Sequence, residues 1–382
     1  MVSGGCGCMK KWFKQFRMFI LIGFLGFVTF ESYQHAVLGG GKAASIHALC
    51  PFGALESLQL ILSQGIMIKR IYAGTFALLL ITVILALFSR RSFCGLICPF
   101  GTLQELFAKL GQKIFKRKFE MDTRVDSYLR YVKYAMLLIA LVSAWKLGEL
   151  WIAPYDPWVA YGHLFSGFEE LIEENIWGLS LLVMTLIGSM LYDRFFCKYM
   201  CPMGAFLALV SKLSPTVIKR DEDHCISCGL CRKVCPVNIK VDLVSEVNSV
   251  ECINCQLCVV DCPVEGALEN RVHKWIVKPG VLLLAVMLLY FGGIGLAKVT
   301  GYGGVLPERI SSTSALTSED IRGYMTLEEV AIGTGIDTEV LYSMLELSDE
   351  VPSNAKMKEL KTLLPGFEVE AVREVVHILN GE

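Results

Sequence analysis

The chain has 382 residues, of which 54% are hydrophobic and only 19% are charged, and its formal net charge is -1. Soluble globular proteins carry about a quarter charged residues, so this composition favours a membrane protein and gives no reason to expect a nucleic-acid partner. Many of the 15 cysteines are closely spaced. In a chain of this length, that spacing indicates metal or cluster ligation in a reducing compartment rather than disulfides.

Five apolar stretches approach the roughly 20 residues that a helix needs to cross a bilayer. They are residues 18–30, 71–88, 131–145, 176–192 and 275–296. No secretory cleavage site follows the first stretch, so we expect it to stay in the protein. The sequence therefore predicts about five transmembrane helices in the plasma (inner) membrane.

Basic residues predict the orientation of these helices. Four of them precede the first stretch, namely Lys10, Lys11, Lys14 and Arg17, and the loop after the second stretch is also basic. The segment 149–175 is acidic and contains no Lys or Arg. The positive-inside rule then places the N-terminus and the region after the fourth stretch in the cytoplasm, although Lys69 and Arg70 lie on the expected outer side. Three tryptophans predict an aromatic belt at the outer interface: Trp151, Trp158 and Trp177.

An internal repeat relates two parts of the chain. The segment FCGLICPFG at 93–101 returns as FCKYMCPMG at 196–204, and CPFGAL at 50–55 resembles DPWVAY at 156–161. Each half reads as a helix, a short outer segment, a second helix and an inner cysteine motif. We therefore expect a two-fold repeat within the bundle, with its axis along the membrane normal.

Two cysteine runs follow the fourth apolar stretch, each with the spacing C-x-x-C-x-x-C-x-x-x-C-P of bacterial two-cluster ferredoxins. In this pattern the last cysteine of each run ligates the other cluster. The expected ligand sets for two [4Fe–4S] clusters are Cys225, Cys228, Cys231 and Cys262, and Cys252, Cys255, Cys258 and Cys235. The alternative to a cluster is a zinc ion. A zinc site needs only four ligands and does not require two such cysteine runs that each end in Cys-Pro. Neither cluster has an open coordination position, so we expect electron transfer rather than substrate chemistry.

Four further cysteines form two C-x-x-x-C-P motifs at the expected cytoplasmic ends of spans: Cys94, Cys98, Cys197 and Cys201. One such pair only places two thiols on one helix face. Two copies related by the repeat could bring four thiolates to one point, so we expect an additional iron–sulfur cluster there, ahead of copper or zinc. The alternative is that these are small apolar residues at helix ends.

Cys50 and Asp156 occupy equivalent positions of the repeat near the outer face, and His47 lies close to Cys50. Polar groups at the edge of a membrane bundle predict a site, so Cys50 and Asp156 are candidate metal ligands or part of a redox or quinone site. The alternative is structural. Pro51 and Pro157 would begin short interfacial helices, with Asp156 as a cap.

Residues 300–382 are polar with helical patterning, and Thr326 begins a run typical of a capped helix start. These residues predict a small helical domain, which five spans would place outside the cell. We find no catalytic constellation in it.

The paired C-x-x-x-C-P motifs, the helices around them and the double ferredoxin motif together resemble the membrane polyferredoxins of the NapH, NosR and CcoG type. The resemblance covers about residues 19–296. It implies electron transfer between a quinol pool or cytoplasmic donor and a partner redox protein. The chain departs from the NosR pattern because it has no recognisable flavin-attachment domain before the helices. The C-terminal helical domain is not part of the basic family architecture.

The sequence thus predicts a membrane α-helical bundle (1–215), an inserted two-cluster ferredoxin domain (216–272), a last transmembrane helix (273–299) and a small helical domain (300–382). We expect an electron-transfer subunit of an oxidoreductase complex, with other redox subunits and membrane lipid as partners and quinone as a further candidate cofactor. One alternative is a self-contained reductase of quinone or metal ions. Another is a structural anchor whose clusters only stabilise the fold.

Overall fold

The computed structural model describes residues 5–38, 45–46, 48–65, 71–147, 152–166, 168–304, 318, 321, 325–345, 347–348, 351–355, 357, 360 and 367–380. It divides into two compact units, Met1–Tyr33 with Ser45–Val305 and Gln34–Ala44 with Leu306–Glu382. His47, Lys69, Arg70 and Trp151 lie outside the described residues.

Helices dominate the chain up to residue 299. In chain order they are α1 (Gly5–Leu38), α2 (Pro51–Gln64), α3 (Ala73–Ser89), α4 (Ser92–Leu96), α5 (Pro99–Phe115), α6 (Thr123–Leu147), α7 (Pro157–Gly162), α8 (Phe168–Leu191), α9 (Phe195–Tyr199), α10 (Pro202–Val210), α11 (Leu230–Lys233), α12 (Leu257–Asp261) and α13 (Pro279–Val299). Short 3-10 turns are η1 (Ala153–Tyr155), η2 (His163–Phe165), η3 (Ser211–Leu213) and η4 (Val241–Leu243).

The five predicted apolar stretches correspond to α1, α3, α6, α8 and α13, although the stretches 71–88, 176–192 and 275–296 extend beyond an end of their helices. Among the described residues, two helices are long and apolar enough to cross a membrane, Lys10–Val37 and Pro279–Val299. Ala73–Ser89 and Asn175–Leu191 are shorter apolar helices. The last helix begins at Pro279 rather than at the predicted residue 275, because Trp275 and Ile276 pair with a neighbouring strand.

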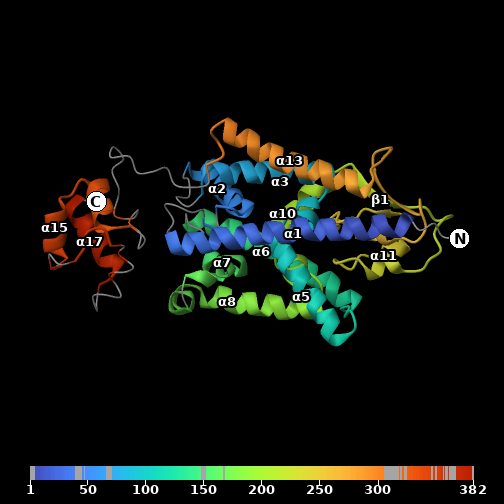
Figure 1. Cartoon of the computed structure of the whole chain (residues 1–382), viewed down its shortest axis with the longest axis horizontal. Helices are drawn as coiled ribbons and strands as arrows, with labels where there is room; N and C mark the ends of the chain where they lie inside the picture. The colour runs from blue at the N-terminus through green and yellow to red at the C-terminus, as the bar shows by residue number, and fades with distance from the viewer. Residues whose placement is uncertain are drawn as a thin grey trace. The chain divides into compact units, whose positions relative to one another are not determined.

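The long helices α1, α3 and α13 run side by side (Figure 1). Phe24 of α1 stacks on Phe291 of α13 with ring centroids 5.7 Å apart, and it meets Tyr290 edge-on at 5.5 Å. Buried aliphatic side chains such as Leu85 and Leu283 fill the space between helices. The helices are therefore held mainly by apolar contacts.

The same order of elements occurs twice, as α2–α3–α4–α5 and as α7–α8–α9–α10. In each half a five-residue helix is followed by a cysteine that serves as the N-cap of the next helix. Cys98 precedes Pro99 of α5, and Cys201 precedes Pro202 of α10. Proline suits the first helical position because the backbone N–H it lacks would have no partner there. The repeat seen in the sequence is therefore a repeat of backbone structure.

A four-stranded antiparallel sheet of order β2-β1-β3-β4 organises the region with the two cysteine runs. Its strands are β1 (Thr216–Arg220), β2 (Glu246–Val247), β3 (Leu268–Val272) and β4 (Trp275–Ile276). Ile218 of β1 lies opposite Val247 of β2 and Asn270 of β3. In sequence, β1 precedes the first cysteine run, and β3 and β4 follow the second. Pairing of these strands therefore brings the two runs close together.

The second unit is built from α14 (Leu327–Thr334), α15 (Thr338–Met344) and α17 (Val369–Asn380). Its core is apolar, with Leu341 and Val372 fully buried. The capped helix start expected at Thr326 is present. The Thr326 hydroxyl accepts from the Glu329 N–H at 3.1 Å, and the Glu329 carboxylate accepts from the Thr326 N–H at 3.0 Å.

Candidate functional site

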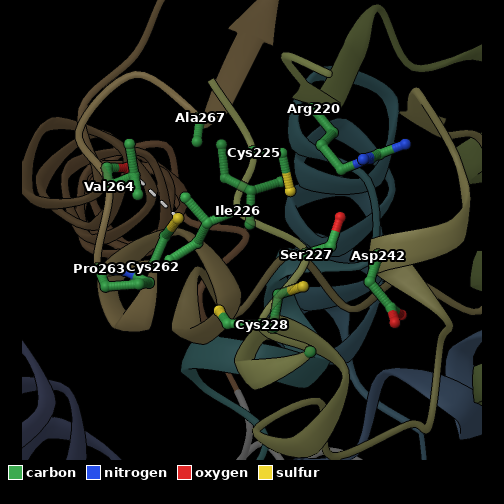
Figure 2. Close-up of a pocket in the computed structure, with 13 residues that line it drawn as sticks. Arg220, Cys225, Ile226, Ser227, Cys228, Asp242, Cys262, Pro263, Val264 and Ala267 are labelled. Atoms are coloured by element: carbon green, nitrogen blue, oxygen red, sulfur yellow. Dashed lines mark hydrogen bonds between the residues drawn. The ribbon is translucent and has the colours of Figure 1, made fainter. Parts of the chain in front are cut away.

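Three cysteines of the first run and the last cysteine of the second run line one cavity of about 360 Å³: Cys225, Cys228, Cys231 and Cys262. Figure 2 shows Cys225, Cys228 and Cys262 around this space, beside Arg220. The loop curls around the cavity through left-handed backbone at Ser227 (φ 52°) and Gly229 (φ 69°). Cys228 is exposed, so this cavity reaches the protein surface. We call it the outer-run cavity.

The remaining four cysteines line a second cavity of about 330 Å³: Cys252, Cys255, Cys258 and Cys235. All four are buried. Asn254 and Gln256 repeat the left-handed turns of the first run, with φ of 48° and 64°. Ile218 and Val247 of the sheet form part of the wall. We call this the inner-run cavity.

The donor sets of both cavities suit a polynuclear cluster better than a single ion. Within the described residues, no three His, Cys, Asp or Glu side chains converge closely enough to hold one metal ion. The thiolates of a cubane bind different irons and so stand farther apart than the ligands of one ion. Each cavity combines three cysteines of one run with one of the other, which is the crossed arrangement that two-cluster ferredoxins require.

The electrostatic environments of the two cavities differ. The Ser227 backbone N–H and the Arg220 side chain hydrogen-bond the Cys225 thiolate and lower the pKa of this thiol. Burial raises the pKa of the Cys252 thiol to about 12. Burial also raises the pKa of the Cys231 and Cys262 thiols, so within the outer-run cavity the surroundings favour the thiolate at Cys225 alone.

The repeat brings the four cysteines of the two C-x-x-x-C-P motifs together. Cys94 and Cys197 lie on α4 and α9, and Cys98 and Cys201 cap α5 and α10. The thiols are close enough to interact electrostatically across the two halves. The Gln104 amide donates to Cys197 Sγ at 3.1 Å. We call this group the four-cysteine site.

Two equivalent buried arginines flank the four-cysteine site, each reaching into the other half of the repeat. Arg194 Nη1 donates to the Cys94 carbonyl at 2.6 Å. A Cβ on Gly101 would lie 2.8 Å from Arg194 Nη1, and one on Gly204 would lie 2.8 Å from Arg91 Nη2, so a larger residue at either position would displace the guanidinium. Within the described part of the chain, the Nε atoms of Arg91 and Arg194 have no hydrogen-bond partner. Buried donors of this kind point to an acceptor that the polypeptide does not provide.

The buried charges around this site leave an excess of positive charge. Arg17 and Arg194 share the single carboxylate of Glu105, at 2.8 and 2.9 Å. Arg91 and Lys133 share the carboxylate of Glu251, at 3.3 and 2.5 Å. Among the fully buried cations, each set has two for one carboxylate and so retains one positive charge; Lys109, 3.9 Å from Glu105, is exposed, and Arg130, 4.0 Å from Glu251, pairs with Asp126. Four thiolates around a [4Fe–4S]²⁺ core carry two negative charges, which these two sets match.

The four-cysteine site lies in contact with the inner-run cavity. Cys94 packs against a buried cluster that contains Cys235, Ile253 and Cys255. A Cβ on Gly95 would overlap the Ile253 carbonyl oxygen and would lie 3.2 Å from Cys255 Cα. Glycine at this position therefore permits the close approach of the two cysteine regions.

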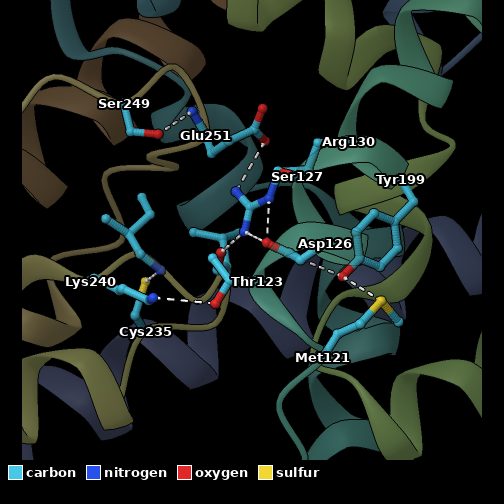
Figure 3. Close-up of polar contacts among 12 residues, drawn as sticks. Met121, Thr123, Asp126, Ser127, Arg130, Tyr199, Cys235, Lys240, Ser249 and Glu251 are labelled. Carbon is cyan, nitrogen blue, oxygen red and sulfur yellow. Dashed lines mark hydrogen bonds and ion pairs between the residues drawn. The ribbon is translucent and has the colours of Figure 1, made fainter.

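Polar contacts from α6 hold the second cysteine run against the helices (Figure 3). Arg130 pairs with Asp126 at 2.7 Å, approaches Glu251 at 4.0 Å and donates to the Val237 carbonyl at 2.8 Å. The Tyr199 hydroxyl donates to Asp126 at 2.6 Å. These contacts join α6, α9 and the loops around the inner-run cavity into one body.

Cys50 and Asp156 line a third cavity, whose lining includes no other cysteine. The structural interpretation of this segment is confirmed: α2 begins at Pro51, α7 begins at Pro157, and Asp156 caps α7 by accepting from the Trp158 N–H at 2.8 Å. The metal interpretation of Cys50 and Asp156 stays a prediction, because His47 lies outside the described residues. We call this space the carboxyl cavity.

Glu56 also lines the carboxyl cavity, although no sequence motif marks this residue. Only 2% of Glu56 is exposed. Burial, together with the Asp156 carboxylate, raises the pKa of Glu56 to about 8, and burial raises the pKa of Asp156 to about 6. Trp158 is a wall of the cavity and is buried, so its expected place in an interfacial belt is wrong, whereas Trp177 is exposed.

Comparison with known proteins adds to this geometry. A family model described as a 4Fe-4S binding domain matches residues 73–118 and 174–220, which contain the paired motifs, and another with the same description matches 218–240. The electron transport protein YccM from Escherichia coli is 29% identical to this chain over 307 residues. The match covers 77% of this chain and 85% of YccM. The uncharacterized protein MJ0749 from Methanocaldococcus jannaschii is 32% identical over 198 residues, or 51% of this chain and 71% of that protein. The ferredoxin-type protein NapH from Escherichia coli is 29% identical over 161 residues, or 41% of this chain and 51% of NapH. No solved structure matches the chain.

Proposed function

This chain belongs to the polyferredoxin family of electron-transport proteins with 4Fe–4S binding domains, as do YccM and NapH, and from this premise we propose that it is a membrane-bound electron-transfer subunit. It passes electrons between a cytoplasmic or quinol donor and a partner redox protein. The outer-run and inner-run cavities each hold a [4Fe–4S] cluster, and the four-cysteine site holds a third iron–sulfur centre. Each such cluster, when bound, accepts and releases one electron.

The observation that carries this proposal is the contact between the cysteine sites. Cys231 of the outer-run cavity packs in one buried cluster with Cys252 and Cys258 of the inner-run cavity. Cys94 of the four-cysteine site packs against the buried cluster that contains Cys235 and Cys255. The three sites therefore contact one another in succession and form a continuous path for electrons. Clusters that only stabilise a fold do not need such a path.

The charges around the four-cysteine site support an anionic centre there. Arg91 and Arg194 are fully buried, and burying unpaired positive charge is costly unless a counter-charge is bound. They share the carboxylates of Glu105 and Glu251 with two further buried cations, Arg17 and Lys133, so two carboxylates compensate four cations. A cluster held by four thiolates supplies the missing negative charge.

We further propose that α1, α3, α6, α8 and α13 cross the plasma membrane, with the ferredoxin region in the cytoplasm. Large apolar side chains such as Leu80, Leu284 and Leu288 are exposed, which suits a lipid environment. Lys10 of α1 donates to the Cys262 carbonyl and Lys14 pairs with Asp261. The basic N-terminal end of α1 therefore lies on the same side as the cysteine runs, as the positive-inside rule predicts for both.

The test is the amount of iron and acid-labile sulfide per chain after anaerobic purification, combined with a double variant, Cys98→Ser with Cys201→Ser. Three [4Fe–4S] centres predict about twelve irons in the wild type, and the variant should retain about eight. The variant should keep the spectra of the two ferredoxin clusters and lose electron transfer to the partner. About eight irons in the wild type would refute the third centre, and full transfer in the variant would favour a structural anchor.

A further inference from the structure

The two halves of the four-cysteine site are equivalent in backbone but differ in the side chains that reach the sulfurs. We propose that Gln104 is a positioning residue that makes the two halves electrically unequal. Its amide stabilises negative charge on the Cys197 sulfur, raises the reduction potential of the site and draws an arriving electron away from Cys94. This inference rests on the proposed function and deepens it, because it gives the electron a preferred side of the third centre.

The backbone hydrogen bonds to the sulfurs follow the repeat. The Gly204 N–H donates to Cys201 Sγ at 3.2 Å, and the Gly101 N–H donates to the Cys98 sulfur. Each glycine follows its cysteine by three residues, in the first turn of the helix that the cysteine caps. These backbone donors therefore treat the two halves alike and create no difference between them.

The side chain of Gln104, on α5, breaks this equivalence. Gln104 is fully buried, and its Nε2 donates to Cys197 Sγ at 3.1 Å and to the Phe100 carbonyl at 3.3 Å. Its Oε1 accepts from the backbone N–H groups of Phe196 and Cys197, at 3.0 and 3.3 Å. A backbone N–H only donates and a carbonyl only accepts, so these contacts fix which end of the amide faces the sulfur. That end is the donor.

The other half of the repeat has leucine in place of this donor. The segments CPFGTLQ at 98–104 and CPMGAFL at 201–207 align without a gap, so Leu207 is the equivalent of Gln104. Leu207 is fully buried and belongs to the apolar cluster against which Cys94 packs. Among the described residues, no side chain donates a hydrogen bond to Cys94 Sγ. The Cys94 sulfur thus lies beside an aliphatic side chain where the Cys197 sulfur meets an amide.

An amide that donates to a ligating sulfur acts on the reduction potential. Reduction adds negative charge to a cluster and its thiolates, so a hydrogen-bond donor stabilises the reduced state more than the oxidised state. Gln104 is shielded from water, which would otherwise compete for the same sulfur. The effect is local, because the donor reaches one of the four sulfurs.

The position of the inner-run cavity gives this inequality a direction. Of the four cysteines in the site, Cys94 is the one that packs against the buried cluster containing Cys235 and Cys255. The electron therefore arrives on the side without the amide and is stabilised on the side of Cys197. The step transfers one electron, which oxidises the inner-run site and reduces the four-cysteine site, and it neither makes nor breaks a bond and moves no proton.

The test exchanges the two equivalent side chains in the anaerobically purified holoprotein in detergent. Gln104→Leu copies the other half, and it should lower the equilibrium constant for reduction of the third centre about tenfold, which is about 59 mV for one electron. Leu207→Gln adds a donor beside Cys94 and should raise this constant by a similar factor. A redox titration followed by electron paramagnetic resonance measures the potentials. The two ferredoxin clusters in the same sample should keep their potentials and serve as the internal control.

The inference requires both shifts. Loosened packing could lower the potential in Gln104→Leu, but it gives no reason for a rise in Leu207→Gln. A fall without the rise assigns Gln104 a purely structural role, and an unchanged third-centre potential in Gln104→Leu refutes its electrostatic role directly. If Gln104→Leu loses the third centre, with iron falling from about twelve to about eight, the presence or absence of the rise in Leu207→Gln decides. About eight irons in the wild type would refute the third centre of the proposed function and this inference with it, whereas about twelve irons with unmoved potentials refute this inference alone.

Discussion

Ile226 and Ile253 occupy the same position in the two cysteine runs, yet 64% of Ile226 and only 2% of Ile253 is exposed. The residues that precede each run differ in the same way. His224 is exposed and pairs with Asp221, whereas Glu251 is buried between Lys133 and Arg91. The two runs thus have the same cysteine spacing but different surroundings. The outer-run cavity is open to solvent, whereas the inner-run cavity is buried against the helix bundle.

Under the proposed function, this difference gives the two cavities separate tasks. An electron-transfer site that exchanges with another protein must come close to the surface, and the outer-run cavity does so through Cys228. A site that exchanges within the chain benefits from a fixed, dry environment, and the inner-run cavity has one beside Cys94. Four predictions test how far this division extends, in order of decreasing effect.

The largest effect is expected from Cys235→Ser. Because Cys235 lines the inner-run cavity with Cys252 and Cys255, its loss should remove or convert that cluster while the outer-run cluster remains. Cys262→Ser is the matched variant and should damage the outer-run cluster. Electron paramagnetic resonance of the reduced proteins distinguishes the two. Loss of the same cluster in both variants would contradict the crossed assignment.

The next effect is expected from Glu251→Gln. Its carboxylate compensates Lys133 and Arg91, both buried, so its neutralisation leaves uncompensated charge and should cost about 3–5 kcal/mol. His224→Gln, at the equivalent exposed position, should leave stability unchanged. The measurement is the thermal loss of cluster absorbance in both variants. Equal stability of the Glu251→Gln and His224→Gln proteins would mean that contacts with the helix bundle do not stabilise the second cysteine run.

A smaller effect is expected from truncating the equivalent isoleucines. Ile253→Ala removes buried side-chain atoms and should destabilise the ferredoxin region by about 2–5 kcal/mol. Ile226→Ala should leave stability unchanged and should slow electron uptake from a soluble donor if the exposed run is the docking face. Denaturant unfolding and stopped-flow reduction separate these results. A stability loss in Ile226→Ala would contradict the exposed environment of the outer run.

The smallest effect is expected from Arg220→Gln. Arg220 hydrogen-bonds the Cys225 thiolate, and its removal should lower the reduction potential of the outer-run cluster slightly, because a positive donor stabilises the reduced, more negative state. The inner-run potential should not change. A redox titration monitored by spectroscopy measures both. A shift confined to the inner-run cluster would reverse the assignment of the two cavities.

The sequence allowed the cysteine groups and the helical repeat to be predicted because both depend on short, local spacing. The apolar stretches likewise predict helices from composition alone. The buried charges were missed, since Arg17 meets Glu105 and Lys133 meets Glu251 only after folding brings distant segments together. Glu56 was missed for a similar reason: within α2 it reads as an ordinary polar residue, and only the position of Asp156 reveals its environment.

The tight anchoring of the ferredoxin region has one further consequence. Arg90 at the end of α3 donates to the carbonyls of Thr216 and Ser249, at 2.6 and 3.0 Å, in addition to the Glu251 and Arg130 contacts. A region tied down in this way cannot swing on a tether between donor and acceptor. The rate of transfer within the chain should therefore be independent of solvent viscosity, and only the encounter with a diffusing partner should slow when glycerol is added.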